Sequence, residues 1–145
     1  MVSISHVGVG VYRIAKTFRF SASHQLLQLP EGHKCRRMHG HSYSVTLILQ
    51  AEALDGWDFV KDYGALRTFG EWVNVQLDHR HLNDVLRDRR EDHPKEAIRN
   101  ASIGDITPTA ENIAKWIYDR WQPVWSELVA VRVSESPDTW AEYSL

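Results

Sequence analysis

The chain has 145 residues and a mass of 16.8 kDa, with 17 lysines and arginines against 19 aspartates and glutamates. This length is typical of one domain, so we expect residues 1–145 to form a single domain whose core needs neither disulfides nor a structural metal. The formal net charge of -2 lacks the basic excess that binding to a nucleic-acid backbone demands. Because no apolar run approaches the roughly 20 residues of a membrane span, we expect no membrane partner either.

The N-terminal segment and the cysteine content indicate a reducing compartment. Residues 1–10 contain no lysine or arginine and no continuous apolar stretch, unlike a secretory signal peptide. The single cysteine excludes an internal disulfide. We therefore expect a cytoplasmic protein, in which the eight histidines are the most informative residues.

Hydrophobic periodicity predicts two strands and a helix in the first half of the chain. Between residues 11 and 20 the large apolar residues fall on even positions, which is typical of a half-buried strand. A second alternation runs from residue 43 to about residue 53. Apolar residues at spacings of three and four then predict an amphipathic helix over residues 63–77.

The second half of the chain predicts a further helix and a hairpin. Thr107, as N-cap, and Pro108 open an apolar stripe that extends to about Pro123. Residues 129–145 alternate around a turn at residues 136–138, which predicts a C-terminal hairpin. The order ββααββ predicts an α+β fold in which an antiparallel four-stranded sheet carries both helices on one face.

Residues 84–106 interrupt this order with charges of both signs. We interpret this connection as a solvated loop with a fragment of helix, because charge runs are usually solvated.

Three histidines fall on predicted inward positions of the first two strands. His39 and His41 are two residues apart, so both leave the same face of an extended chain. His24 shares the inward parity of the first strand if that strand stays extended beyond residue 22. Three imidazoles leave a tetrahedral Zn²⁺ with one open position, as in catalytic zinc sites. We therefore predict a zinc site formed by His24, His39 and His41.

The alternative is that these histidines are unrelated core or surface residues, each satisfied by one or two hydrogen bonds. Three imidazoles on converging inward faces favour the metal. His33, in a predicted loop beside Gly32, is a weaker ligand candidate, and His6 is weaker still.

Cys35 lies four residues before His39 and is surrounded by Lys34, Arg36 and Arg37. Cationic neighbours favour the thiolate, which is the form that acts as a base or nucleophile. A lone cysteine is often a small buried hydrophobic residue, but a loop with three cations is a poor place for one. Cys35 can instead be a fourth zinc ligand, which would close the site.

Two carboxylates are further candidates. Asp78 directly precedes His79 after the first predicted helix, and such a pair can act as an oriented acid and base, although both residues are ordinary at helix ends. Glu135 continues the inward parity of the alternating valines in residues 129–133. A carboxylate at the end of such a row either emerges into solvent or lines a pocket.

Five motifs spread over nearly the whole chain connect these residues, namely FSASH, EGHKCRRMHGH, LDHRHLND, PTAEN and VRVSE. They resemble the family of 6-pyruvoyltetrahydropterin and 6-carboxytetrahydropterin synthases, and the Cys-x3-His-Gly-His spacing with an upstream histidine is highly specific. The resemblance implies the T-fold (tunnelling fold), in which several subunits close their sheets into a β-barrel. It also implies a homo-hexamer built from two trimers, with active sites at subunit boundaries.

The resemblance implies a role for each candidate residue. In that family the positions of His24, His39 and His41 bind zinc, and the position of Cys35 is the catalytic proton acceptor. Zinc as a Lewis acid and a nearby thiolate suit the removal of a proton from a carbon that carries a hydroxyl group.

Further roles follow from the same resemblance. Asp78 and His79 match the relay of the catalytic cysteine. Glu135 matches the residue that anchors the pterin ring, and Thr109 and Glu111 match a segment beside that ring.

Within the family, the cysteine spacing resembles the 6-carboxytetrahydropterin synthases of the queuosine (7-deazaguanine) pathway. The implied reaction converts 7,8-dihydroneopterin triphosphate to 6-carboxy-5,6,7,8-tetrahydropterin with loss of acetaldehyde and triphosphate. Lys34, Arg36 and Arg37 are available to neutralise the triphosphate, although surface solvation explains them equally well. His81 stands where the family has Asn or Tyr, and the connection of residues 84–106 is longer than usual.

Two other functions stay open. A 6-pyruvoyltetrahydropterin synthase would stop after triphosphate elimination and internal redox chemistry. A non-catalytic zinc-dependent binding module would use Cys35 to close the coordination sphere.

Overall fold

The computed structural model describes residues 8–86 and 106–145. His6 and nearly all of the charged connection predicted as a loop therefore lie outside the described residues. In chain order the elements are β1 (Tyr12–His24), the 3-10 helix η1 (Lys34–Arg36), β2 (His39–Ala51), the 3-10 helix η2 (Tyr63–Leu66), α1 (Arg67–Gln76), β3 (Arg80–His81), α2 (Leu82–Val85), α3 (Ala110–Trp121), β4 (Leu128–Ser136) and β5 (Thr139–Ser144).

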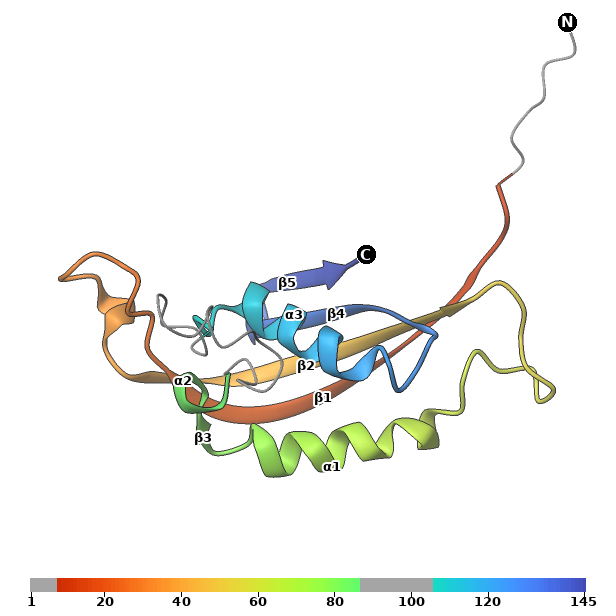
Figure 1. Cartoon of the computed structure of the whole chain (residues 1–145), viewed down its shortest axis with the longest axis horizontal. Coiled ribbons are helices and arrows are strands. Elements are labelled where there is room, and N and C mark those ends of the chain that lie inside the picture. The colour runs from red at the N-terminus through yellow and green to blue at the C-terminus, as the bar shows by residue number, and fades with distance from the viewer. Residues whose placement is uncertain (1–7, 87–105) are drawn as a thin grey trace, which may run out of the picture.

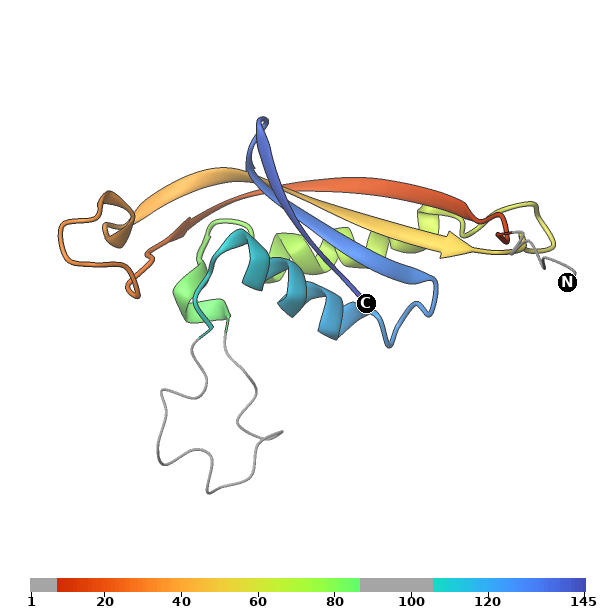
Figure 2. The same cartoon turned by 90° about the horizontal axis from the view of Figure 1, so that it is seen from above.

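The strands form one mixed sheet in the order β3-β1-β2-β4-β5, so the described sheet has five strands where four were predicted. The additional strand is β3, which is only two residues long and pairs in parallel with β1. The four predicted strands are present and pair antiparallel with their neighbours. Helices α1 and α3 lie on the same face of this sheet, as Figures 1 and 2 show.

The long hairpin of β1 and β2 determines which side chains face the helices. In β1 the even positions face inward, and burial increases toward its end, where Phe20, Ala22 and His24 are all buried. The Cα partners are His24 with His39 and Ala22 with His41. Both strands are thus longer than predicted at the end that carries the histidines, and the inward row of apolar side chains continues directly into imidazoles.

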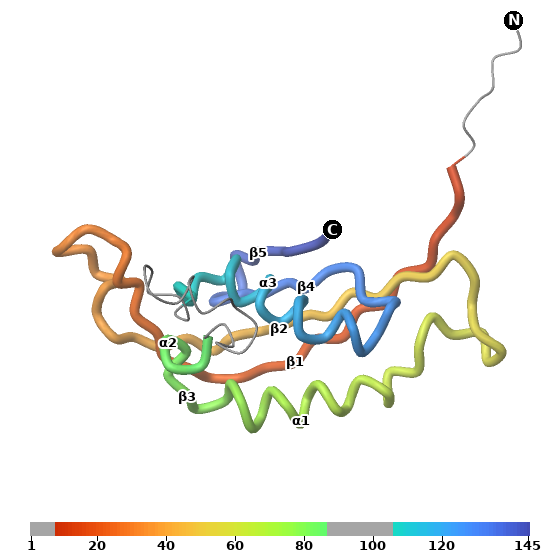
Figure 3. Tube along the Cα trace, in the orientation of Figure 1, coloured from red at the N-terminus to blue at the C-terminus, as the bar shows by residue number. Residues whose placement is uncertain are grey.

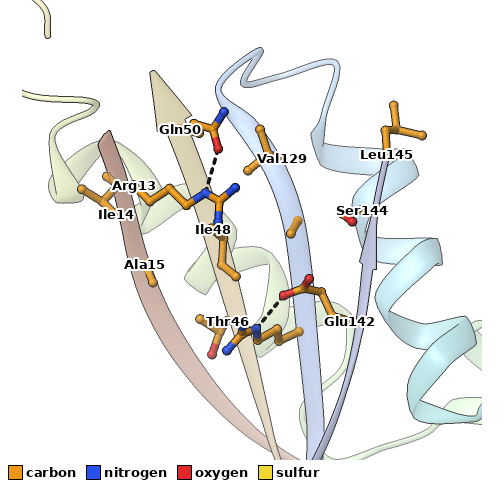
Figure 4. A pocket seen from close by; sticks show the side chains of 12 residues that line it. Arg13, Ile14, Ala15, Thr46, Ile48, Gln50, Val129, Glu142, Ser144 and Leu145 are labelled. Atoms are coloured by element: carbon orange, nitrogen blue, oxygen red, sulfur yellow. Dashed lines mark hydrogen bonds and ion pairs between the residues drawn. The ribbon is translucent and has the colours of Figure 1, made fainter. Parts of the chain in front are cut away.

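The prediction that Val129 belongs to the inward row of β4 is wrong. The register between β2 and β4 shifts between Ile48 and Leu49, so that Leu128 is buried opposite Leu49 while Val129 lies on the face without helices. Figure 4 shows Val129 there, near the hydrogen bond from Arg13 Nε to Gln50 Oε1. Because the irregularity lies before Val131, the inward positions from there to Glu135 keep the predicted parity.

The second long helix starts later than predicted. The N-cap of α3 is Thr109, whose hydroxyl accepts a hydrogen bond from the Asn112 N–H at 3.2 Å, so Thr107 and Pro108 precede the helix. The Asn112 side chain donates to the Thr107 carbonyl at 2.9 Å, which fixes this entry. The first helix also differs, because its predicted first turn is the 3-10 helix η2. Every helix in the described parts of the chain is too short or too polar to span a membrane.

We predict that the close packing of α1 on the sheet limits the size of residue 70. A Cβ atom at Gly70 would lie 3.0 Å from Phe18 Cε1, closer than van der Waals contact allows. Gly70→Leu should lower the free energy of unfolding by about 1–3 kcal/mol despite the better helix propensity of leucine. Thr68→Leu, at an exposed position of the same helix, is the control and should leave it nearly unchanged. Equal stability of both variants in urea denaturation would contradict this packing.

Candidate functional site

Three imidazoles meet at the end of the sheet where β1 ends and β2 begins. The Nε2 atom of His24 lies 2.9 Å from Nε2 of His39 and 3.1 Å from Nε2 of His41. All three ligand atoms lie within 4.8 Å of one another. The loop between the two strands and the beginning of α3 lie at the same end of the molecule (Figure 3).

The hydrogen bonds of the imidazoles fit a bound cation. His24 donates from Nδ1 to the Pro108 carbonyl at 2.8 Å, and His39 donates from Nδ1 to the Arg37 carbonyl at 2.7 Å. A carbonyl oxygen only accepts, so in a neutral ring the proton is on Nδ1 and Nε2 carries a lone pair. Two lone pairs that face each other at 2.9 Å repel, and a cation between them removes this conflict.

Burial favours the neutral form that metal binding requires. His24 is completely buried, and desolvation lowers the pKa of its imidazole, with the bond to the Pro108 carbonyl opposing this shift. Tyr43 packs against the same ring, with its hydroxyl 3.2 Å from His24 Nδ1. Burial raises the pKa of the Tyr43 hydroxyl, so this neighbour also stays neutral.

The backbone around the histidines is held by contacts that the motifs supply. The Asn83 side chain accepts from the Gln25 N–H and donates to the Gln25 carbonyl, both at 2.8 Å, which fixes the residue after His24. Gly40 allows the close approach of β1, because a Cβ atom there would lie 3.2 Å from the Ala22 carbonyl oxygen. The asparagine of LDHRHLND and the glycine of HGH thus position the imidazoles.

Cys35 lies in η1, in the loop that joins β1 to β2, and is half-buried. His33 caps this short helix by accepting a hydrogen bond from the Cys35 N–H at 3.1 Å, which explains why it is not in the histidine cluster. The Cys35 carbonyl accepts from the Leu26 N–H at 2.9 Å, which ties the loop to the end of β1. Among the described residues, the cluster of close ligand atoms contains the three histidines and not Cys35.

Arg36, one of the cations beside Cys35, holds the loop together. Arg36 donates from Nη1 to the carbonyls of Leu27 and Leu29, at 2.6 and 2.7 Å. This guanidinium closes the loop around Cys35 through its Nη1 nitrogen.

Asp78 and His79 form a hydrogen-bonded pair at the edge of β1. Asp78 Oδ2 accepts from His79 Nδ1 at 2.8 Å, and Oδ1 accepts from the Ser21 N–H at 2.9 Å. The bond from Ser21 is the largest of the effects that lower the pKa of Asp78, followed by the bond from His79. His79 adopts a left-handed backbone with φ of 57°, and its side chain is 83% exposed. An ionised carboxylate thus orients an accessible imidazole.

Glu135 lies beside the histidine cluster, with Oε2 3.7 Å from His41 Nε2. It lines a cavity of about 260 Å³ together with Thr109 and Glu111, so the structure brings the three predicted ring-binding residues together. The Thr109 hydroxyl also caps α3. Trp140 lines the same cavity and was not singled out from the sequence.

Sequence reasoning missed the contacts of the turn after α1. Ser23 Oγ lies 2.9 Å from His81 Nδ1, across the parallel pairing of β1 and β3. Two residues are too few for an alternation that could have revealed β3. The available signal was the unusual density of histidine in LDHRHLND.

Known proteins are similar to this chain in sequence and in fold. A family profile described as 6-pyruvoyl tetrahydropterin synthase matches residues 13–145. The chain is 34% identical over 110 residues to 6-carboxy-5,6,7,8-tetrahydropterin synthase of Synechocystis sp., which covers 72% of this chain and 70% of the relative. It is 29% identical over 138 residues to the protein of the same name from Bacillus subtilis, covering 91% and 84%. The structure of Caenorhabditis elegans 6-pyruvoyl tetrahydropterin synthase matches with a TM-score of 0.71 at 22% identity, covering 94% and 97%.

We predict that removal of one imidazole abolishes metal binding without unfolding the chain. His39→Ala should reduce the zinc content of the purified protein from about one ion per chain to a small fraction, because two ligands hold zinc poorly. His33→Asn removes an imidazole outside the cluster and should keep the metal. Metal analysis and circular dichroism of both variants check this. Full zinc occupancy in His39→Ala would contradict the assignment.

Proposed function

The chain belongs to the 6-pyruvoyl tetrahydropterin synthase family, and on that premise we propose that it is a zinc-dependent 6-carboxytetrahydropterin synthase. The reaction converts 7,8-dihydroneopterin triphosphate and one water to 6-carboxy-5,6,7,8-tetrahydropterin, acetaldehyde and triphosphate, in queuosine or related 7-deazapurine biosynthesis. The names of the Synechocystis and Bacillus subtilis relatives support this choice. The observation that carries the proposal is the cluster of three imidazole Nε2 atoms beside a cavity that contains Glu135.

The metal would be held by His24, His39 and His41. Zinc held there would supply Lewis acidity, which would make a C–H bond next to a hydroxyl group of the substrate more acidic. Two of the ligands are preorganised, because carbonyl groups fix the Nδ1 protons of His24 and His39. The chain therefore needs little rearrangement to present three nitrogen lone pairs.

Proton transfer is assigned to Cys35 and to the pair of Asp78 and His79. The Cys35 thiolate takes the proton from the side chain of the substrate, and the compact loop held by Arg36 limits its movement. Asp78 holds the Nδ1 proton of His79, which leaves Nε2 to accept or return a proton. The positive φ of His79 presents the ring at the edge of β1.

Recognition of the pterin is assigned to the cavity beside the metal centre. The 2-amino-4-oxo edge of a pterin carries two adjacent N–H donors, and a carboxylate such as Glu135 accepts both. Glu111 and Thr109 line the same cavity, and Trp140 adds an aromatic surface. The short distance between Glu135 and His41 would place the side chain of the pterin near the metal ligands.

The proposed assembly is a hexamer of two trimers in which the sheets close into a barrel. β3 and β5 are the edges of the described sheet and offer unpaired backbone groups. The face without helices carries paired polar groups such as Arg132 with Glu142, and suits the inside of a water-filled barrel. Figure 4 labels Glu142 on this face. The exposed ring of His79 would then contribute to an active site at a subunit boundary.

We predict the products of the reaction and the consequence of removing the thiol. The zinc-loaded protein should convert 7,8-dihydroneopterin triphosphate to 6-carboxytetrahydropterin and acetaldehyde, as measured by mass spectrometry. Cys35→Ala should lower turnover by roughly 10²–10⁴-fold because the general base is lost, and the zinc content should stay unchanged. A 6-pyruvoyl product would identify the related synthase. Loss of zinc together with activity would instead support a closed site with Cys35 as ligand.

We predict that Glu135 determines the selectivity for the pterin ring. Glu135→Gln retains the shape of the side chain but presents an amide donor to one of the two pterin donors. A hydrogen bond to a charged group contributes about 1.5–3 kcal/mol, so KM should rise roughly 10- to 150-fold. Zinc content and thermal stability should remain those of the parent. If steady-state kinetics show parental KM and kcat, the ring is recognised elsewhere, and Glu111 is the next residue to test.

A further inference from the structure

Tyr43 lies directly beside the imidazole cluster and is itself almost completely buried. Its side chain is 1% exposed and lies on the inward row of β2 that also carries His39 and His41. The Tyr43 hydroxyl lies 3.2 Å from Nδ1 of His24. Within residues 8–86 and 106–145 this hydroxyl has no other hydrogen-bond partner. The contact therefore links Tyr43 to the most deeply buried histidine of the cluster.

Aromatic contacts fix the position of the Tyr43 ring. The ring stacks on Phe20, with the two planes only 8° from parallel. It meets the imidazoles of His24 and His41 edge to face, with centroids 6.0 and 5.5 Å apart. Because the phenolic oxygen lies on the long axis of the ring, a fixed ring also fixes the hydroxyl next to His24.

The neighbouring carbonyl decides the direction of the hydrogen bond between Tyr43 and His24. Nδ1 of His24 lies 2.8 Å from the Pro108 carbonyl oxygen, closer than the 3.2 Å to the Tyr43 hydroxyl. A carbonyl only accepts, so Nδ1 carries the ring proton. The Tyr43 oxygen consequently faces an N–H group and is its second acceptor, as in three-centre hydrogen bonds. Both oxygens favour the tautomer in which Nε2 of His24 has the lone pair that a metal needs.

Core packing accounts for the ring of Tyr43 but not for its hydroxyl. Phenylalanine would fill the same space and keep the contacts with Phe20, His24 and His41. As an acceptor from His24, the hydroxyl has no acceptor for its own proton in the described parts of the chain. Burial of such a donor opposes folding. The hydroxyl therefore does not serve the stability of the core, and its position beside His24 indicates a role in metal binding.

We propose that Tyr43 is a positioning residue of the metal centre, whose hydroxyl holds the His24 imidazole in the tautomer and orientation that bind zinc. Tyr43 acts through Nδ1 of His24, together with the Pro108 carbonyl at the entry to α3. Acceptance of the Nδ1 proton also makes Nε2 a stronger electron-pair donor. The inference rests on the part of the proposed function that assigns zinc to the three histidines, and it is independent of the substrate.

Tyr43→Phe tests this role, because it removes the hydroxyl and keeps the ring. The zinc dissociation constant, measured by competition with a chelator of known affinity, should rise about 10- to 100-fold. The free energy of unfolding of the zinc-free protein in urea should stay the same or increase, because a buried hydroxyl is lost. A merely structural tyrosine would give the opposite result, with lower stability and an unchanged dissociation constant, and this would overturn the proposal.

Tyr118→Phe is the matched control for the loss of a buried hydroxyl. Tyr118 is a tyrosine of α3 that is 5% exposed and packs against the ring of Tyr143. Its replacement should leave the zinc dissociation constant unchanged. Equal weakening of zinc binding by Tyr118→Phe and Tyr43→Phe would overturn the proposal, because the effect would then not depend on the contact with His24.

The sign of the change separates the two directions of the hydrogen bond. If Tyr43 donated its proton to Nδ1, it would favour the other tautomer of His24, and Tyr43→Phe would bind zinc more tightly. Unchanged or tighter binding therefore overturns the role of Tyr43, while the metal site of the proposed function stands.

Zinc binding and turnover separate this inference from the proposed function. Parent protein that binds no zinc would contradict the metal site and the role of Tyr43 together. If Tyr43→Phe weakens zinc binding as expected but the parent forms no 6-carboxytetrahydropterin, the role of Tyr43 stands and the proposed reaction is wrong.

Discussion

The pairing of His24 with His39 across the β1–β2 hairpin is the constraint on which the rest of the site depends. Side chains alternate between the two faces of a sheet, so a slip of one residue would turn an imidazole from the helix face to the opposite face. Phe20 and Tyr43 are Cα partners in the same hairpin, and their stacked rings have centroids 4.9 Å apart. Both rings belong to the buried inward row, so their packing fixes this register. Ordinary core packing thus aligns the three imidazoles.

The other elements of the site follow from this register. His24 reaches the Pro108 carbonyl just before α3, which connects the imidazole cluster to the helix that carries Thr109 and Glu111. The inward row of β4 ends at Glu135, which lies next to His41. One hairpin therefore positions the imidazole cluster next to a carboxylate and a cavity.

The parts of the fold and of the site that the sequence predicts are those that have a periodic pattern of side chains. Alternation predicted the strands, and the shared parity of His24, His39 and His41 predicted their convergence, because the period of a strand fixes which side chains share a face. Features that depend on single contacts were missed or misplaced. The shift near Ile48 moved Val129 to the other face, and the side-chain cap at Thr109 shortened α3. Neither the register shift nor the side-chain cap produces a periodic pattern in the sequence.

Contacts with backbone carbonyls were also beyond the reach of sequence reasoning. From the sequence, Arg36 is a cation without a predicted partner. In the folded loop its guanidinium donates to two backbone carbonyls. The same kind of contact fixes the tautomers of His24 and His39 and leaves an Nε2 lone pair on each ring that can bind a metal. Such contacts require the relative position of segments that are distant in the sequence, as for Pro108.

X-ray absorption spectroscopy at the zinc edge measures the central claim most directly. A centre of three imidazoles with an exchangeable fourth position predicts only nitrogen or oxygen neighbours, at about 2.0–2.1 Å, in the zinc-loaded protein. The spectrum should be the same in the parent and in Cys35→Ala. A sulfur neighbour at about 2.3 Å that disappears in Cys35→Ala would show that the thiol is a ligand and would contradict its assignment as the base.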